Sequence, residues 1–289
     1  MATAAEWVEG ARLRTLPAAV APVVVGTGAA AQLDSASPAR ALLAAGVALA
    51  LQVGVNYAND YSDGVRGTDL ERVGPMRLTG SGAAPPNQVR AAAFAAFGVG
   101  ALLGLALVAV SGHWWLVAVG ALSIAAGWFY TGGKRPYGYR GLGEVGVFVF
   151  FGLVAVLGTT YTQADRISWP AVAGAVGVGL LACALLMVNN IRDIPTDALT
   201  SKRTLAVRLG DHRARRVYAG MLAVAMLAGL ACALVAPWSV LVLLVAVPAG
   251  ILAGTVLLGA RGVLLKPVLA GTGLVELGYG VLLGLGLAI

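Results

Sequence analysis

Charge is the first thing that this sequence lacks. Only 11% of its 289 residues are charged and 59% are hydrophobic, whereas soluble proteins carry about 25% charged residues. Apolar runs of about 20 residues recur along the chain, each long enough to cross a bilayer as a helix. We count about nine, centred near residues 23, 48, 100, 122, 152, 179, 225, 248 and 278. The composition therefore excludes a soluble domain and predicts an all-α, polytopic membrane bundle of about nine transmembrane helices.

Cysteine and histidine are also scarce, which removes several kinds of site. Cys183 and Cys232 both fall inside predicted spans, so no disulfide framework is expected. His113 and His212 are isolated, so neither a zinc-binding spacing nor a Ser-His-Asp triad is present. The first eleven residues contain no Lys or Arg, which argues against a cleaved signal peptide. A Pro/Ser-rich linker is missing too, so we expect residues 1–289 to form a single integral membrane domain.

The basic residues that are present lie almost entirely on one side of the predicted spans. If the N-terminus is cytoplasmic and nine spans alternate, only Arg40 and Arg166 fall outside. This distribution follows the positive-inside rule. It predicts a multi-pass protein of the cell membrane with a cytoplasmic N-terminus, cytoplasmic active-site loops and a C-terminus outside. The net charge of +7 thus reflects topology and contact with membrane lipid, and nucleic acid is not an expected partner.

A polar stripe interrupts the second apolar run, in the segment NYANDYSDGVRGTD. Asn56, Asn59, Asp60 and Asp63 follow the spacing i, i+3, i+4, i+7, so they share one face of a helix. Polar groups within a membrane span are costly and almost always face the bundle interior or a wet cavity. Asp69 lies beyond two glycines and off that face, so a loop must bring it back.

A second polar cluster ends the sixth apolar run, in the segment NNIRDIPTD. Asn189, Asp193 and Asp197 repeat every four residues, with Asn190 and Arg192 beside them. Pro195 is expected to kink or end the helix between the two aspartates. Both clusters lie on the predicted cytoplasmic side, so we expect them to face one central cavity that opens there.

Two groups of carboxylates at one membrane face repel each other unless a cation neutralises them. Oxygen ligands without histidine or cysteine suit a hard ion, and Mg²⁺ above all, which takes one or two carboxylates and completes its shell with water and substrate phosphate. Simple helix capping by solvated aspartates is the plain alternative, and a metal-coupled transporter that uses the same carboxylates as a relay is the functional one. Lys134, Arg135, Arg192 and Lys202 surround the clusters, and such a density of cations favours a diphosphate ligand over transport.

A basic loop with aromatic residues, YTGGKRPYGYRGLGE, follows the fourth apolar run. It carries Lys134 and Arg135 among Tyr130, Tyr137 and Tyr139. Beside two carboxylate clusters, this loop is interpreted as an anion clamp with aromatic walls, over which an electron-deficient carbon could be steadied.

These motifs resemble those of the UbiA-type membrane prenyltransferases, and within that family the branch that acts on 1,4-dihydroxy-2-naphthoate. The similarity begins at RTLPAAVAPVVVGTG and continues through NYANDYSDGVRGTDLERVGPMRLTGSG and YTGGKRPYGYRGLGEVGVFVFFG to NNIRDIPTDALTSKRTLAVRLGD, so it covers nearly the whole chain. One departure is that the third aspartate of the first motif, Asp69, comes two residues later than in many members of the wider family.

The resemblance implies roles for particular residues. Asp60, Asp63, Asp69, Asp193 and Asp197 would bind Mg²⁺. Asp60, Asp63, Asp193 and Lys134 would be catalytic. Substrate would be bound by Asn56, Asn59, Tyr130, Asn189 and Asn190 of these motifs. Independently of the resemblance, we also expect the neighbouring Arg66, Arg135, Tyr139, Arg192 and Lys202 to bind it.

The resemblance also implies a reaction, which is Mg²⁺-dependent transfer of a polyprenyl group from polyprenyl diphosphate to 1,4-dihydroxy-2-naphthoate. Loss of CO₂ and diphosphate would give demethylmenaquinol, a step of menaquinone biosynthesis. A family member with another acceptor, such as a hydroxybenzoate or a glyceryl-phosphate lipid precursor, is the closest alternative. Glu276, in the middle of the last predicted span, fits either a functional role or a hydrogen bond between helices.

Overall fold

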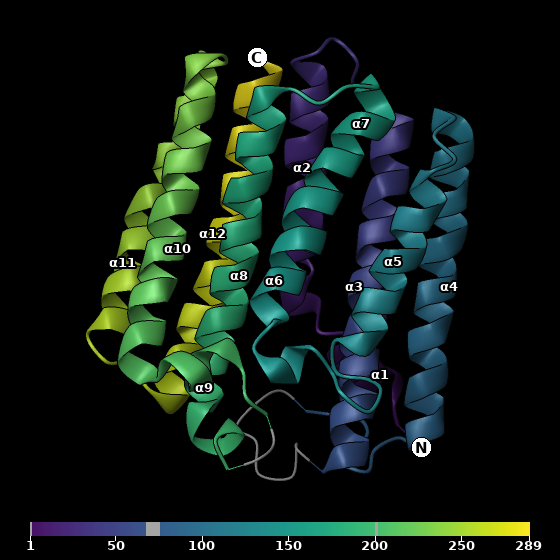
Figure 1. Ribbon diagram of the computed structural model, residues 1–289, viewed down its shortest axis with the longest axis vertical. Helices are drawn as coiled ribbons and strands as arrows, with labels where there is room; N and C mark the ends of the chain where they lie inside the picture. The colour runs from purple at the N-terminus through teal and green to yellow at the C-terminus, as the bar shows by residue number, and fades with distance from the viewer. Residues whose placement is uncertain (1, 68–75, 200–201) are drawn as a thin grey trace.

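The computed structural model describes residues 2–67, 76–199 and 202–289, and all regular secondary structure in these ranges is helical. The longer helices run side by side along the long axis of the molecule (Figure 1). The helical elements of the first half are α1 (Ala4–Gly10), η1 (Leu13–Thr15), α2 (Pro17–Ala31), α3 (Pro38–Arg66), α4 (Pro86–Ser111), α5 (Leu116–Phe129), η2 (Gly138–Arg140), α6 (Gly143–Val147), the π-helix η3 (Phe148–Leu157) and α7 (Gly158–Ala164). The helical elements of the second half are α8 (Trp169–Asp197), α9 (Leu205–Leu209), α10 (Asp211–Ala231), η4 (Cys232–Leu234), η5 (Pro237–Val245), α11 (Ala246–Leu257), η6 (Gly262–Leu264) and α12 (Leu265–Ala288).

Seven helices in the described ranges are long and apolar enough to cross a membrane, and an eighth span results if the segments Ala4–Thr15 and Pro17–Ala31, bent by 47°, count as one. The predicted class, a multi-pass helical membrane protein, is confirmed, but the count of nine is only approximate. The difference is α5, an apolar helix of 14 residues. At about 1.5 Å per residue it is about 21 Å long, short of the ~30 Å hydrocarbon core.

The helix α8 forms the centre of the bundle. In its most apolar stretch 72% of the residues are buried, and it packs against α10, α12 and η3. Small residues permit this density. A Cβ added at Gly280 of α12 would lie 2.8 Å from the Cα of Ala21 in α2, so only glycine allows the two helices to approach so closely. Pro195 does not end α8, which continues to Asp197.

The two ends of the bundle differ in chemistry. At one end, called the site end below, α3 and α8 finish in their polar clusters, and α1, η2 and α9 lie there as well (Figure 1). At the other, called the far end, α7 finishes and α8 begins. Because α3 and α8 both run toward the site end, their carboxylates reach the same end of the molecule.

Candidate active site

Asp60 is fully buried and both of its carboxylate oxygens accept hydrogen bonds from backbone. The N–H of Leu78 donates to Oδ2 at 2.8 Å, and the N–H of Thr79 donates to Oδ1 at 2.9 Å. Two backbone N–H groups that donate to one carboxylate hold the donors and the carboxylate in a fixed arrangement. Asp60 therefore anchors the segment around residue 78 to the end of α3.

Asp63, one turn further along α3, faces two other groups. The Tyr139 hydroxyl donates to its Oδ1 at 2.6 Å, and the Arg77 guanidinium lies 3.5 Å from its Oδ2. The side chains of Arg77 and Asp63 are almost fully buried. The loop that Asp60 holds thus delivers Arg77 to the neighbouring carboxylate.

The amides of the α3 stripe contact other elements. Asn56 donates to the carbonyl oxygen of Ala11 and to Oγ1 of Thr15, both at 2.9 Å. The Oδ1 of Asn59 accepts a hydrogen bond of 2.8 Å from the Thr131 hydroxyl. These bonds tie the middle of α3 to the N-terminal segment and to the basic loop.

The cluster at the end of α8 contains two ion pairs. Arg192 donates to both oxygens of Asp193, at 2.7 and 2.8 Å, and to Oδ1 of Asn189 at 2.8 Å. The Nζ of Lys202 lies 3.4 Å from Oδ1 of Asp197. A buried pair such as Arg192–Asp193 is costly to break, because either partner alone would remain as an unpaired buried charge.

Tyr139 connects the two clusters. Its hydroxyl bonds to Asp63, while Arg66 and Lys202 lie against its ring at 5.4 and 5.7 Å from the centroid. Its carbonyl oxygen accepts from the N–H of Arg203 at 2.9 Å. Because Lys202 also pairs with Asp197, a chain of contacts leads from the first cluster through Tyr139 to the second. The carboxylates that the sequence places far apart are therefore brought to one region.

Several predicted residues lie elsewhere. Lys134 and Arg135 are exposed, and neither belongs to the cavity lining described below. Asn190 is buried and donates to Oε1 of Glu144 at 3.2 Å, which makes it a contact between α8 and α6. Asp69 lies outside the described residues. Arg66 binds the carbonyl oxygens of Thr131 and Gly133, so it shapes the loop in which Lys134 lies.

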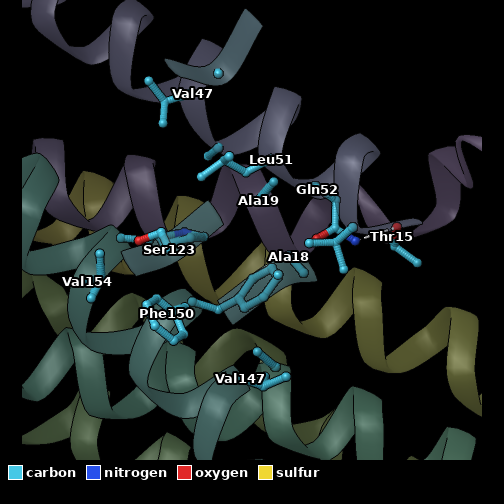
Figure 2. Close-up of a pocket in the computed structure, with 18 of the residues that line it drawn as sticks. Thr15, Ala18, Ala19, Val47, Leu51, Gln52, Ser123, Val147, Phe150 and Val154 are labelled. Atoms are coloured by element: carbon cyan, nitrogen blue, oxygen red, sulfur yellow. Dashed lines mark hydrogen bonds between the residues drawn. The ribbon is translucent and has the colours of Figure 1, made fainter. Parts of the chain in front are cut away.

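A cavity of about 1490 Å³ begins beside the clusters, larger than the ~300–1,000 Å³ of a typical small-molecule pocket. Its polar lining at the site end consists of Glu9, Arg12, Arg14, Thr15, Gln52, Asn56, Asn59, Arg77, Tyr130, Tyr137, Asn189, Arg192 and Lys266. Beyond this the wall is almost entirely apolar. Figure 2 shows the change, with Thr15 and Gln52 together at one side and Val47, Leu51, Phe150 and Val154 along the remainder.

Sequence reasoning misses some lining residues. In the sequence Arg12, Arg14 and Lys266 indicate only topology, and Tyr137 is one aromatic residue of the basic loop. In the structure Tyr137 forms an edge-to-face pair with Tyr130, with ring centroids 5.5 Å apart. Burial raises the pKa of Tyr137 to about 12, so its hydroxyl stays protonated at neutral pH. Arg12 and Arg14 lie in the basic run RLRTLP, but no pattern within this run distinguishes a residue that lines a cavity from one in an ordinary loop.

The donor set fits magnesium. Among the described residues no three His, Cys, Asp or Glu side chains group as a ready-made metal cage, but Mg²⁺ commonly needs only one or two carboxylates and takes its other ligands from phosphate and water. Asp63, Asp193 and Asp197 each pair with an Arg or Lys in the contacts above. A bound diphosphate could pair with those cations, and the carboxylates could then coordinate a metal.

Comparisons with known proteins place this geometry in context. A model of the UbiA prenyltransferase family matches residues 19–266. The chain is 57% identical to the 1,4-dihydroxy-2-naphthoate octaprenyltransferase of Mycobacterium tuberculosis, across 96% of this chain and 94% of that protein. It is 43% identical to the Escherichia coli protein of the same name, across 75% and 72%.

Two solved structures share the fold. A UbiA homologue from Aeropyrum pernix superposes with a TM-score of 0.71 at 17% identity and covers 93% of this chain and 96% of its own. A UbiA homologue from Archaeoglobus fulgidus bound to GPP and Mg²⁺ superposes with a TM-score of 0.67 at 12% identity, covering 98% and 99%. At these identities the likeness concerns the fold alone.

Proposed function

Since this chain belongs to the UbiA prenyltransferase family, we propose that it transfers a polyprenyl group from polyprenyl diphosphate to 1,4-dihydroxy-2-naphthoate. The products are demethylmenaquinol, CO₂ and diphosphate, so the reaction belongs to menaquinone biosynthesis. The relatives with this activity in their names match nearly the full length of the chain. The observation that carries the proposal is the cavity, which joins a cationic, amide-rich end to a long apolar interior. A prenyl diphosphate has the same two parts.

The site end can hold the diphosphate. Arg77 and Arg192 line the cavity there, and Arg66 and Lys202 lie nearby on the Tyr139 ring. As the allylic C–O bond breaks, the electron pair leaves with the diphosphate. Fixed cations aimed at that developing charge stabilise the transition state, and such electrostatic stabilisation is often the largest single contribution to catalysis.

Magnesium is part of this proposal. Asp63, Asp193 and Asp197 would hold it, and when bound it would add positive charge against the leaving diphosphate. Asp60 belongs to the same predicted set, although its two oxygens already accept backbone N–H groups. The solved relative with GPP and Mg²⁺ supports the choice of ion.

The allylic cation then meets the acceptor. Tyr130 and Tyr137 place two aromatic faces beside the polar end, where they can stabilise positive charge. The apolar wall keeps water from the cation. The ring carbon that carries the carboxylate attacks, a C–C bond forms, and the C–CO₂ bond breaks so that its electrons restore the aromatic ring. Arg12 and Arg14 also line this end, and their positive charge would orient the naphthoate carboxylate before it is lost.

We further propose that the site end faces the cytoplasm and that the membrane is the cell membrane. The basic residues that line the cavity all lie at the site end, namely Arg12, Arg14, Arg77, Arg192 and Lys266. The positive-inside rule favours the cytoplasm for such an end, where water-soluble diphosphate is released. Residues 1–289 would then act as one catalytic unit.

The direct test uses purified protein, a polyprenyl diphosphate and naphthoate labelled in its carboxyl group. We expect labelled CO₂ and prenylated quinol in equal amounts, their loss with EDTA, and their return with Mg²⁺. Product formation that persists in EDTA would rule out the metal. Transfer to a hydroxybenzoate or a glyceryl-phosphate lipid with no transfer to naphthoate would assign a different acceptor, and metal uptake without transfer would favour a transporter.

A further inference from the structure

The apolar part of the cavity runs from the site end to the far end of the bundle. On α3 its lining extends from Asn59 back to Ala44, which at about 1.5 Å per residue spans about 22 Å along the helix. The last lining residues at the far end are Val108 of α4, Trp115 before α5, Tyr161 and Thr162 of α7, and Ile167. The cavity thus has a definite depth.

A cluster of neighbouring aromatic rings lies at that far end. The Tyr161 ring lies 5.7 Å from Trp115 in an edge-to-face arrangement and 4.5 Å from His113. His113 is held by Asp165, with Nε2 and Oδ1 2.6 Å apart. Tyr161 therefore packs against two residues of the loop between α4 and α5.

Hydrogen bonds across the bundle hold the helices around these rings. Arg40 at the start of α3 donates to the carbonyl oxygens of Thr162, at 2.9 Å, and of Val110, at 3.1 Å. Gln163 donates to Thr27 of α2 at 3.1 Å and accepts from the N–H of Ser37 at 2.9 Å. Four helices, α2, α3, α4 and α7, are thus linked at the level of Tyr161, which opposes their separation there.

We propose that Tyr161 and Trp115 form the end wall of the tail-binding cavity and limit how much of an isoprenoid tail can lie straight inside the protein. The inference rests on the proposed function and specifies the length of its substrate. Each isoprene unit adds four main-chain carbons, which at about 1.5 Å per bond in a zigzag extend the tail by about 5 Å. About four units fill a depth of about 22 Å. Units beyond these must turn aside, between helices or into lipid.

The position of the tail can be tested without turnover. A geranylgeranyl diphosphate with a photoreactive group at the end of its tail is crosslinked to the full-length protein in detergent, and the labelled peptides are identified by mass spectrometry. We expect the label on the peptides that contain Trp115 or Tyr161. Label confined to peptides of other regions would overturn the proposal whether or not the protein transfers prenyl groups.

A competition assay then tests the limit on length. The protein is given octaprenyl and geranylgeranyl diphosphates together, and the two prenylated products are compared. In Tyr161→Ala the ratio of long to short product should rise by about threefold or more, since enlarging a pocket changes selectivity at least this much in other enzymes. Trp115→Ala should act in the same direction. Trp115 is 59% exposed, so its truncation is expected to leave the fold intact.

Two control variants separate pocket size from other effects. Tyr161→Phe keeps the ring and should keep the wild-type ratio. Trp169→Ala removes an exposed tryptophan at the same end that does not line the cavity, and should also leave the ratio unchanged. An unchanged product ratio in both Tyr161→Ala and Trp115→Ala, with transfer still measurable, would refute the end wall. Absence of every prenylated product in the wild-type protein, with the crosslink at Tyr161, would instead refute the proposed reaction and retain the tail site.

Discussion

Replacing Asp60 with Asn should loosen the backbone around residue 78, whereas replacing Asp63 with Asn should leave that backbone in place. Both oxygens of Asp60 accept buried backbone N–H groups, from Leu78 and Thr79. In Asp60→Asn one of these acceptors becomes an NH₂ group that faces an N–H donor. Hydrogen bonds to a charged group contribute about 1.5–3 kcal/mol, and an unsatisfied buried donor adds about 1–3 kcal/mol. We therefore expect a loss of about 2.5–6 kcal/mol.

Asp63→Asn is the matched control on the same helix. Its Oδ1 can still accept from the Tyr139 hydroxyl, and the Arg77 contact at 3.5 Å is the weaker of these two interactions. Because the Arg77 and Asp63 side chains are both almost fully buried, loss of the carboxylate charge also lowers stability, but neither contact involves the backbone of Leu78 or Thr79.

The assay combines thermal unfolding in detergent with hydrogen exchange. Asp60→Asn should lower Tm by several degrees and deprotect the amides of Leu78 and Thr79. Asp63→Asn should lower prenyl transfer and Tm but leave the amides of Leu78 and Thr79 protected. A wild-type Tm and full protection of both amides in Asp60→Asn, with only a weaker response to Mg²⁺, would refute the anchoring role and leave Asp60 as a metal ligand alone.

Three further substitutions have expected outcomes. Tyr139→Phe removes the hydroxyl that donates to Asp63 at 2.6 Å but keeps the ring. The value of kcat/KM for prenyl transfer should fall by about 10- to 100-fold, which corresponds to the free energy of one hydrogen bond to a charged group. An unchanged kcat/KM would show that catalysis does not use this bond. Arg192→Ala leaves Asp193 buried without this arginine, so stability should drop by about 3–5 kcal/mol, and the double variant with Asp193→Asn should regain part of the loss of Tm. Glu276 is fully buried, and neither of its oxygens makes a hydrogen bond within the described residues. Glu276→Leu should therefore keep or raise Tm. Loss of prenyl transfer at a native Tm would reveal a functional role.

The helices could be predicted from the sequence because hydrocarbon imposes one strong rule. Apolar runs of membrane length must be helical, since every backbone group has to be satisfied internally. The centres predicted for the spans all fall within helical segments of the structure. This prediction of spans fails for α5, which has only 14 helical residues. The aromatic residues Trp114, Trp115 and Tyr130 flank it and are not helical. Hydropathy does not distinguish these flanking residues from a full span.

The polar stripe was predictable for a similar reason, but its partners were not. Spacing alone puts Asn56, Asn59, Asp60 and Asp63 on one face of α3. It does not reveal that Asp60 accepts two N–H groups from a loop, because backbone donors carry no sequence signal. Tyr139 illustrates the same limit. Its connection of the two clusters depends on how η2 folds back between α3 and α8, which is a property of tertiary packing.

The charge balance of the site gives the proposed magnesium a role in the proposed chemistry. The contacts at the site end bring together four carboxylates, Asp60, Asp63, Asp193 and Asp197, and four cations, Arg66, Arg77, Arg192 and Lys202. These contacting groups sum to zero, and the cavity lining adds Arg12, Arg14 and Lys266 against Glu9. A prenyl diphosphate carries several negative charges, and the charge on the diphosphate grows as the C–O bond breaks. In a partly buried site the repulsion between the diphosphate and the carboxylates is weakly screened. Divalent cations restore the balance and let the carboxylates attract the substrate indirectly. The acidic residues would otherwise oppose the reaction that the surrounding arginines and lysine favour.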